Sequence, residues 1–289
     1  MKRFYFLVAL LIGLIVAITA CGGPASTPQE PAATLLPLPT SPTAKPTEAQ
    51  PTSTRTSPSS PTPTPIPLER EPTSTPTEVP REMEFKFTFA EDAEGWTFGF
   101  ADLPADYDQS SFELDSGYRE LPSGLKGNGL FLQGHNRSDD LFMFLGKLAE
   151  GLGPERRYRV RVTVDLATNV PAGLVGVGGS PGESVYVKAG VSAVEPMVVA
   201  DEAGWLRINI DKGNQANDGR HMVVLGNLAH PEINGDEYRI KTLGNQDNPI
   251  EVVTDTEGRA WLTIGTDSGF EGLTTVYYSR ISYLFELAE

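Results

Sequence analysis

Apolar and polar side chains alternate along much of the second half of the chain. The clearest example is residues 157–166, where every second side chain is apolar: Tyr158, Val160, Val162, Val164 and Leu166. Arginine, threonine or aspartate stands between them. A period of two predicts a β-strand with one face in a core and the other toward solvent. The same alternation returns at residues 205–210 and 259–264. It returns again at residues 275–285, where it predicts one shared face for Thr275, Tyr277, Ser279, Ile281, Tyr283 and Phe285.

Shorter apolar segments predict further strands, and glycine-rich turns separate many of them. These segments are residues 85–89, 129–133, 141–145, 174–177, 184–188, 197–200, 221–225, 238–243 and 250–254. A short helix within residues 141–152 is the alternative for that stretch. Many short strands joined by such turns predict an all-β domain over residues 81–289, an antiparallel β-sandwich or jelly roll.

A segment of different composition precedes this domain. Residues 24–80 contain 16 of the 24 prolines and 20 serines and threonines, with no glycine and no aromatic residue. Proline lacks the amide hydrogen that a helix needs, and so little apolar surface leaves nothing to bury. We therefore expect residues 21–80 to form a disordered tether, with a reach of at most roughly 175 Å in polyproline II geometry. Its serine and threonine density allows O-glycosylation.

The N-terminus has the features of an export signal. Two basic residues precede an apolar run over residues 4–18, which is shorter than the roughly 20 residues of a membrane-spanning helix. Residues 18–21 read Ile-Thr-Ala-Cys, which resembles a bacterial lipobox. The resemblance implies a signal peptide over residues 1–20, cleaved before a lipidated Cys21. A palmitate-bearing lipoprotein would then lie outside the cytoplasm, anchored to the cell membrane or outer membrane. An ordinary signal peptide is the alternative.

Charge and cysteine content exclude several classes of protein. The formal net charge of −15 resides in residues 81–289, which hold 33 acidic and 18 basic residues. Such a surface repels phosphate backbones, so we do not expect a nucleic-acid partner. Cys21 is the single cysteine, which excludes an intramolecular disulfide, a cysteine-rich zinc site and a CxxC redox centre.

Both ends of the domain resemble one known family. Residues 87–96, FTFAEDAEGW, resemble the first strand of galactose-binding-like jelly rolls, which include many carbohydrate-binding modules. Residues 275–281, TVYYSRI, resemble their last strand. The resemblance implies a sugar-binding jelly roll with Trp96 in its core and a structural calcium site. The chain departs from the family at Ala90 and Ser279, where acidic residues of that site are usual, and the middle of the domain resembles no characterised family.

The alternation also predicts a candidate sugar-binding surface. Trp205 and Trp261 stand on strand faces opposite their aliphatic neighbours, and Tyr186 alternates with valines. Arg207 and Asn209 share the face of Trp205. An aromatic ring can stack on the C–H face of a sugar while neighbouring polar side chains bind its hydroxyls. The alternative is that a loop or an extra layer covers these rings.

Acidic residues on expected turns are candidate calcium ligands, because calcium takes six to eight oxygen ligands. These candidates are Asp139, Asp140, Glu183, Asp211, Asp267 and Glu271. Their spacing matches no EF-hand loop, and turn formation alone favours aspartate at such positions.

The chain contains neither His-Glu-x-x-His nor Gly-x-Ser-x-Gly, two motifs that mark hydrolytic sites. The leading interpretation is therefore a non-catalytic, lipid-anchored β-sandwich that binds a carbohydrate or another extracellular ligand. One alternative is a hydrolase or lyase that acts on surface polysaccharide. A structural or adhesive surface protein is the other.

Overall fold

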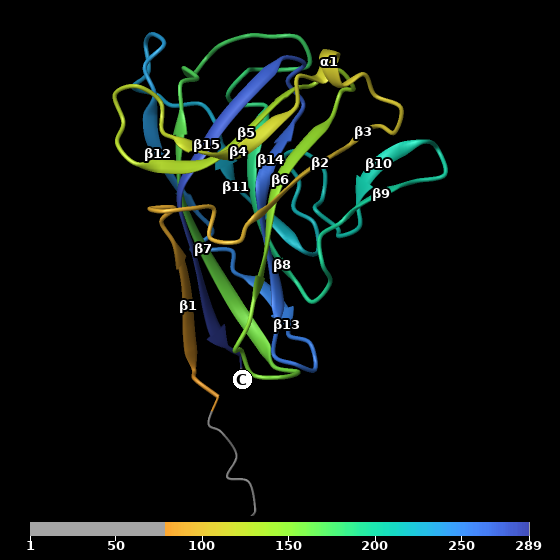
Figure 1. Cartoon of the computed structure of the whole chain (residues 1–289), viewed down its shortest axis with the longest axis vertical. Helices are drawn as coiled ribbons and strands as arrows, with labels where there is room; N and C mark the ends of the chain where they lie inside the picture. Colours follow the sequence, from red (N-terminus) through yellow and green to blue (C-terminus); the bar gives the residue numbers. More distant parts are fainter. Residues whose placement is uncertain (1–78, 289) are drawn as a thin grey trace, which may run out of the picture. The chain divides into compact units, whose positions relative to one another are not determined.

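The computed structural model describes residues 79–288, in which β-strands are the main regular structure (Figure 1). The predicted signal peptide, the predicted lipidation site Cys21 and almost all of the tether predicted for residues 21–80 lie outside the described residues. Helix α1 spans Gln109–Phe112, where the Asp108 side chain caps the first turn by accepting a hydrogen bond from the Ser110 N–H. No helix among the described residues is long and apolar enough to cross a membrane.

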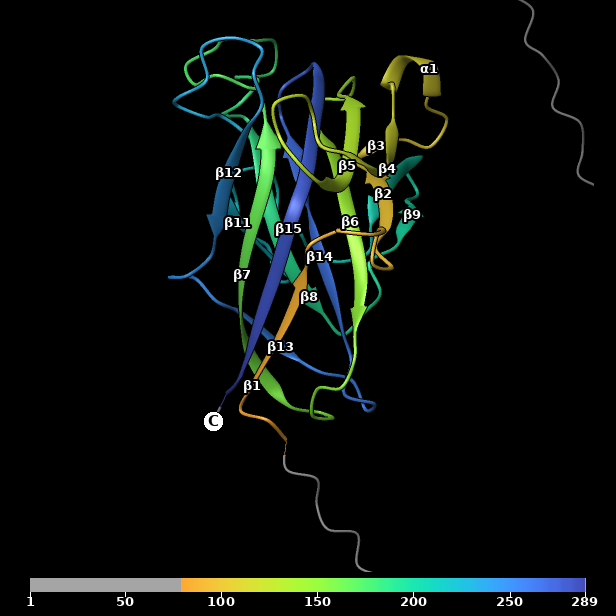
Figure 2. The ribbon, with the colours of Figure 1, turned by 60° about the vertical axis from the view of Figure 1, so that its left-hand side comes forward.

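The first sheet contains seven antiparallel strands. The two longest, β7 and β15, lie at its centre and pair with each other (Figure 2). Its strands are β1 (Glu82–Phe87), β4 (Asp115–Glu120), β5 (Asn128–His135), β7 (Arg157–Thr168), β12 (Arg239–Gly244), β13 (Ile250–Val253) and β15 (Leu273–Leu287). Strand β15 pairs with β5 along its first half and with β1 along its second half. Strand β7 pairs with β13 along its first part and with β12 along its second half. Two long strands therefore hold the sheet together.

The second sheet has five antiparallel strands in the order β11-β8-β14-β6-β2. They are β2 (Thr97–Ala101), β6 (Leu141–Ala149), β8 (Val185–Ser192), β11 (Met222–Asn227) and β14 (Ala260–Ser268). The inner faces of the two sheets enclose the main core, to which Val162 and Tyr283 of the first sheet and Leu262 and Ile264 of the second belong. Trp96 also lies in this core, as predicted. The predicted antiparallel β-sandwich is confirmed.

A small third layer covers part of the outer face of the second sheet. It is a three-stranded sheet of β3 (Leu103–Pro104), β10 (Trp205–Ile208) and β9 (Val198–Ala200). Figure 1 shows β9 and β10 set to one side of β2 and β6. Phe142, Phe144 and Met222 of the second sheet pack there against Ile208 and Ile210 in a separate apolar cluster. Strand β6 is therefore buried on both faces.

This double burial explains why the sequence left residues 141–152 open to a helical alternative. Residues 141–146 are all buried, so their apolar run carries no visible period of two. The stretch is strand β6, and the helical alternative is wrong.

Strand β15 departs from the alternation predicted for residues 275–285. Its register shifts between Tyr278 and Arg280. Val276 and Tyr278 face the core before the shift, and Ile281 and Tyr283 face it afterwards. An extra residue in one strand forms a β-bulge, which moves all later side chains to the opposite face. The predicted phase is therefore wrong for the first half of this strand.

The strand predicted at residues 174–177 is absent, and these residues lie in the loop between β7 and β8. Leu174, Val175 and Val177 are exposed, Val175 at 95% of its surface. Gly173 and Gly178 on either side have φ angles of 81° and 69°. Such angles lie in the left-handed region, outside the extended conformation of a strand.

Candidate functional site

A polar cleft of about 430 Å³ opens beside the third layer. Its lining includes six charged or amide side chains, namely Asp102, Asp140, Arg207, Asp211, Lys212 and Asn214. We call it the Arg207 cleft. Polar groups that converge on a hollow are what a small-molecule or sugar site requires, so this cleft is the candidate functional site.

Two tight turns bring the lining residues together. Asp102 stands between β2 and β3 with a φ angle of 62°, and its N–H donates to the carbonyl of Leu206 at 2.7 Å. Gly213 follows Lys212 with a φ angle of 73°, and a Cβ added there would lie 2.2 Å from the carbonyl oxygen of Asn217. Glycine is therefore required at this turn, which places Lys212 over the second sheet.

Asp267 lies beneath the cleft on the outer face of β14, and its side chain is fully buried. Its Oδ2 accepts hydrogen bonds from Lys188 Nζ at 3.1 Å and from Lys212 Nζ at 2.7 Å. The backbone N–H of Gln215 donates to the same oxygen at 2.8 Å. A buried charge is costly unless it is paired, so these three donors stabilise the buried carboxylate of Asp267.

Three carboxylates surround the ammonium of Lys212. Its Nζ lies 2.7 Å from Asp267 Oδ2, 2.9 Å from Asp102 Oδ2 and 3.9 Å from Asp140 Oδ2. Asp102, Asp140 and Asp267 offer oxygens within 4.8 Å of one another, a spacing that could hold a metal ion. The lysine ammonium stands among these oxygens and already supplies positive charge there.

Protonation states within this cluster diverge. Burial raises the pKa of Asp140 to about 8, and the charges of Asp267 and Asp102 add to the effect while Lys212 opposes it. Burial alone would also raise the pKa of Asp267, but Lys212 and Lys188 hold it below its usual value. Asp140 is therefore protonated at neutral pH and donates the hydrogen bond that it shares with the Asp267 carboxylate.

Arg207 connects this buried cluster to the surface. Its Nη1 donates to Asp102 Oδ1 at 2.8 Å, and its Nε lies 3.5 Å from Asp201 Oδ2. The guanidinium also lies 4.9 Å from the centre of the Trp205 ring, within cation–π range. Because the Arg207 side chain remains 41% exposed, it can still meet a ligand.

The residues predicted for a sugar-binding surface do not form one platform. Trp205 and Arg207 lie together beside the cleft. Asn209 instead holds the β9–β10 hairpin, because its side chain accepts from the Met197 N–H and donates to the carbonyl of Glu195. Tyr186 is half-buried opposite Asp267 on the neighbouring strand.

Trp261 belongs to another part of the surface. It is half-buried on β14 in the second sheet, whereas Trp205 is in the third layer. Asp267 lies six positions further along the same strand, about 20 Å away at the rise of an extended chain. The two tryptophans are therefore in different sheets.

The candidate calcium ligands are also divided. Asp140 and Asp267 come together, with Asp102 as their third partner. The Asp211 carboxylate instead accepts backbone hydrogen bonds from Gly213 and Arg220 within its own loop.

The other acidic candidates lie in loops outside the carboxylate triad. Asp139 is exposed and has a φ angle of 65°. Glu183 accepts a hydrogen bond from the Gly173 N–H at 2.7 Å. Glu271 is exposed, and its N–H donates to the carbonyl of Val177.

Sequence reasoning missed three members of the cluster, Asp102, Lys188 and Lys212. Two of them carried a signal. Lys188 interrupts the apolar run of β8, VYVKAGVS, and Asp102 interrupts FGFADLP. A lone charge within an apolar segment indicates a buried partner, because an unpaired buried charge is unstable. Lys212 lies in a polar loop and carried no such signal.

No protein-family model and no curated protein matches the chain. Among solved structures, it is similar to TmCBM61 in complex with β-1,4-galactotriose, with a TM-score of 0.31 and 11% identity over 68% of this chain and 90% of that one. For TmCBM27, described as recognising mannan, the TM-score is 0.38 and the identity 11%, over 72% of this chain and 99% of that one. For a putative sugar-binding protein of Bacteroides thetaiotaomicron, the TM-score is 0.34 and the identity 9%, over 66% of this chain and 88% of that one. Likeness at this level assigns neither a ligand nor a binding site.

Proposed function

We infer that the β-sandwich binds a carbohydrate in the Arg207 cleft and performs no catalysis there. The observation that carries this proposal is the lining of the cleft, where donors and acceptors are fixed by mutual hydrogen bonds next to an aromatic ring. Lys212 and Asp102 are held in place by their ion pair, and Arg207 is held between Asp102 and Trp205. Polar groups fixed in this way bind hydroxyls without a large loss of conformational entropy.

The ion pairs also support a non-catalytic role for the cleft. A glycosidase needs one carboxylic acid and one carboxylate about 5 to 10 Å apart, both free to reach the scissile bond. Asp267 is fully buried, and Lys188 and Lys212 both bind it. Asp102 is 3% exposed and pairs with Lys212 and Arg207. The carboxylates of the cluster are thus engaged in holding the fold.

A hydrolase is the second candidate, and one observation favours it. Asp140 lines the cleft as a carboxylic acid, because burial raises its pKa to about 8. A protonated acid beside ionised carboxylates is the arrangement of a general acid. Release of reducing ends from a panel of polysaccharides, lost in Asp140→Asn, would establish this candidate and contradict the non-catalytic proposal.

Binding is tested with the purified full-length chain on a glycan array that includes galactan and mannan oligosaccharides. Trp205→Ala should weaken binding of any captured glycan roughly twofold to tenfold, the range for loss of one aromatic contact. Arg207→Met should weaken it by a similar factor. Trp261→Ala, in the other sheet, is the matched control and should bind like the wild type.

Two results would contradict the cleft as the binding site. One is the absence of binding to every glycan on the array. The other is a loss of binding in Trp261→Ala while Trp205→Ala and Arg207→Met, folded as judged by thermal melting, bind normally.

Display at a membrane is the remaining part of the proposal, and it rests on the lipobox-like residues 18–21. We infer that lipid on Cys21 anchors the chain and that the proline-rich segment holds the sandwich away from the membrane. Radiolabelled palmitate should enter the wild-type chain in cells and not the Cys21→Ser variant. Absence of label from the wild type would contradict the anchor.

A further inference from the structure

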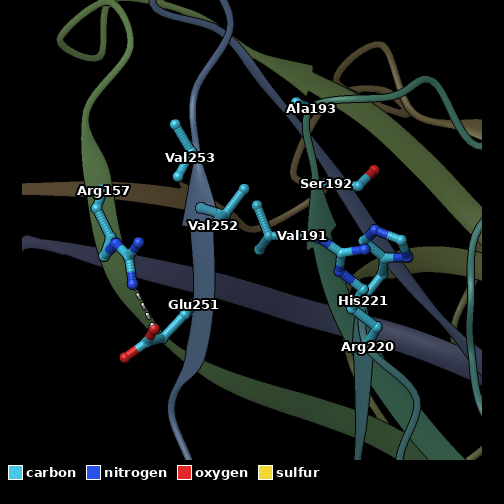
Figure 3. Close-up of a pocket in the computed structure, with 9 residues that line it drawn as sticks. All are labelled: Arg157, Val191, Ser192, Ala193, Arg220, His221, Glu251, Val252 and Val253. Carbon is cyan, nitrogen blue, oxygen red and sulfur yellow. Dashed lines mark hydrogen bonds and ion pairs between the residues drawn. The ribbon is translucent and has the colours of Figure 1, made fainter.

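A second hollow of about 430 Å³ lies where edge strand β13 of the first sheet faces strand β8 of the second. Its lining includes Arg157 and Glu251 on one side and Arg220 and His221 on the other, as Figure 3 shows. Val191 and Val252 stand between these two groups (Figure 3). We call this hollow the edge pocket.

Two arginines and one glutamate line the edge pocket, although the domain as a whole is strongly acidic. Glu251 is already engaged, because its two carboxylate oxygens lie 3.3 Å from Arg157 Nη1 and 3.7 Å from Arg159 Nε. Arg220 forms no ion pair within residues 79–288 at a distance of 4.0 Å or less. The lining therefore offers a guanidinium whose hydrogen-bond donors have no carboxylate partner among the described residues.

His221 adds a neutral donor. Its Nδ1 accepts a hydrogen bond from the Asp211 backbone N–H at 3.0 Å, so the hydrogen of the neutral ring resides on Nε2. Burial and the neighbouring charge of Arg220 lower the pKa of His221, which keeps the ring neutral at physiological pH. The Asp211 carboxylate also accepts the Arg220 backbone N–H at 3.0 Å. The Asp211 carbonyl also accepts the His221 backbone N–H at 3.0 Å, so Asp211 fixes the backbone of both residues.

The floor of the pocket is apolar. Val191 is 1% exposed and Val252 is 7% exposed, and Val253 extends this surface to the outside. A ligand that fits must therefore join an anionic group for the arginines to an uncharged body for the valines. A carboxylate suits the planar guanidinium, because the two can form parallel hydrogen bonds.

We propose that the edge pocket is a second binding site, for a small organic carboxylate whose charged group pairs with Arg220 and whose uncharged body rests on Val191 and Val252. Arg157 supports the same charge from the opposite side, in competition with Glu251. The site is independent of the sugar-binding cleft proposed above.

The test is saturation-transfer difference NMR on the purified full-length chain, with D-glucuronate and 4-methylpentanoate as probes. D-glucose is the neutral match of glucuronate. Both carboxylates should give a signal and glucose should give none at this pocket. Arg220→Met should weaken carboxylate binding roughly tenfold or more, the usual effect of losing a charge-assisted hydrogen bond. Arg157→Met, at a side chain that is 62% exposed and therefore safe for folding, should weaken it less.

Two further variants sharpen the test. Glu251→Gln releases Arg157 and removes a competing carboxylate, so it should strengthen binding roughly twofold to fivefold, the range for an exposed ion pair. Lys126→Met removes one positive charge in the loop between β4 and β5 and should leave binding unchanged.

Glucuronate binding without 4-methylpentanoate binding would support the site and identify its ligand as an acidic sugar. Binding of 4-methylpentanoate alone would support it with an aliphatic acid as the ligand. Absence of signal from both carboxylates overturns the proposal, as does carboxylate binding that folded Arg220→Met and Glu251→Gln leave unchanged. Trp205→Ala and Arg207→Met should bind carboxylates normally, so failure here and failure of the sugar-binding cleft are distinguishable.

Discussion

The inner and outer faces of the second sheet are buried in different ways. Val187, Leu262 and Ile264 point inward and join the apolar core between the main sheets. The outer face meets the third layer with Phe142 and Phe144, but it also buries Asp267 and Lys188 completely. The same strands thus bury a largely apolar set of side chains on one side and a mixed set with paired charges on the other.

This difference shows what each kind of contact specifies. Apolar burial has no direction, so Phe142 and Phe144 would accept many apolar covers. Asp267 accepts only a segment that brings hydrogen-bond donors, and the loop after β10 brings Lys212 Nζ and the Gln215 N–H. The apolar contacts stabilise the packing of the third layer on the sheet, and the charges determine which loop lies there.

The largest expected effect comes from removing the charge on which the outer contacts converge. Asp267→Ala leaves Lys188 and Lys212 without their shared partner, so we expect a loss of about 3 to 5 kcal/mol in the free energy of unfolding. Ile264→Val on the inner face of the same strand should cost about 0.5 to 1.5 kcal/mol. Urea unfolding of the two variants measures both values, and equal losses would contradict the role of Asp267.

Replacement of the whole buried group by apolar residues sharpens the same comparison. The triple variant Asp267→Leu, Lys188→Met and Lys212→Met removes the three charges together and leaves Asp102 paired with Arg207. It should be more stable than Asp267→Ala, because an apolar group of similar volume avoids the cost of burying ions. A triple variant less stable than Asp267→Ala would show that shape, not charge compensation, dominates the outer face.

A smaller effect is expected from the protonated acid of the cluster. The folded state holds the Asp140 proton up to about pH 8, whereas an unfolded aspartate loses it near pH 4. Stability due to this group is therefore present at low pH and falls as the pH rises from about 4 to about 8. Asp140→Asn keeps a neutral donor toward Asp267, so its stability relative to the wild type should increase steadily as the pH rises from about 4 to about 8.

Chemical unfolding of both proteins at several pH values measures this difference. Lys212 and Lys188 hold the pKa of Asp267 below its usual value, against the effect of burial, so the stability due to Asp267 is lost only as the pH falls below about 4. His221, whose pKa burial lowers, titrates in both proteins and cancels in the comparison. A constant difference between pH 4 and pH 8 would contradict the raised pKa of Asp140.

The smallest expected effect concerns calcium at the same three carboxylates. Lys212 already stands among Asp102, Asp140 and Asp267, so an added cation would meet like charge. Calcium and EDTA should therefore leave the melting temperature of the wild type unchanged. A rise in that temperature with calcium would show that the ion enters in spite of the lysine, and Lys212→Ala should then bind it more tightly.

The fold was predictable where one face of a strand is wet. Strand β7 keeps its period of two over its first ten residues, and its buried and exposed positions follow the sequence. Prediction was less successful where a neighbour changes the environment. The third layer hides the period of β6, and the bulge at Ser279 reverses the phase of β15. Neither feature can be read from the residues themselves, because both depend on what packs against the strand.

The candidate site was predictable in part for a similar reason. The alternation placed Trp205 and Arg207 on the same face, and the structure has the Arg207 guanidinium 4.9 Å from the Trp205 ring. It carried no information on sheet membership, so Trp261 was grouped with them although it lies in another sheet. The partners of Asp267 come from positions 55 and 79 residues away along the chain, which no local pattern can connect.

The pairing of β1 with β15 determines how the sandwich bears mechanical load. Glu82 begins β1 opposite Glu286, and the described chain enters at that end of the sandwich, where β15 also finishes (Figure 1). A pull on Glu82, resisted at the opposite end of the sandwich, acts along the strand axis. It shears all six residue pairs from Glu82 to Phe87 together instead of peeling them apart one by one. The seam at which the chain enters the domain therefore opposes a pull with all of its residue pairs at once.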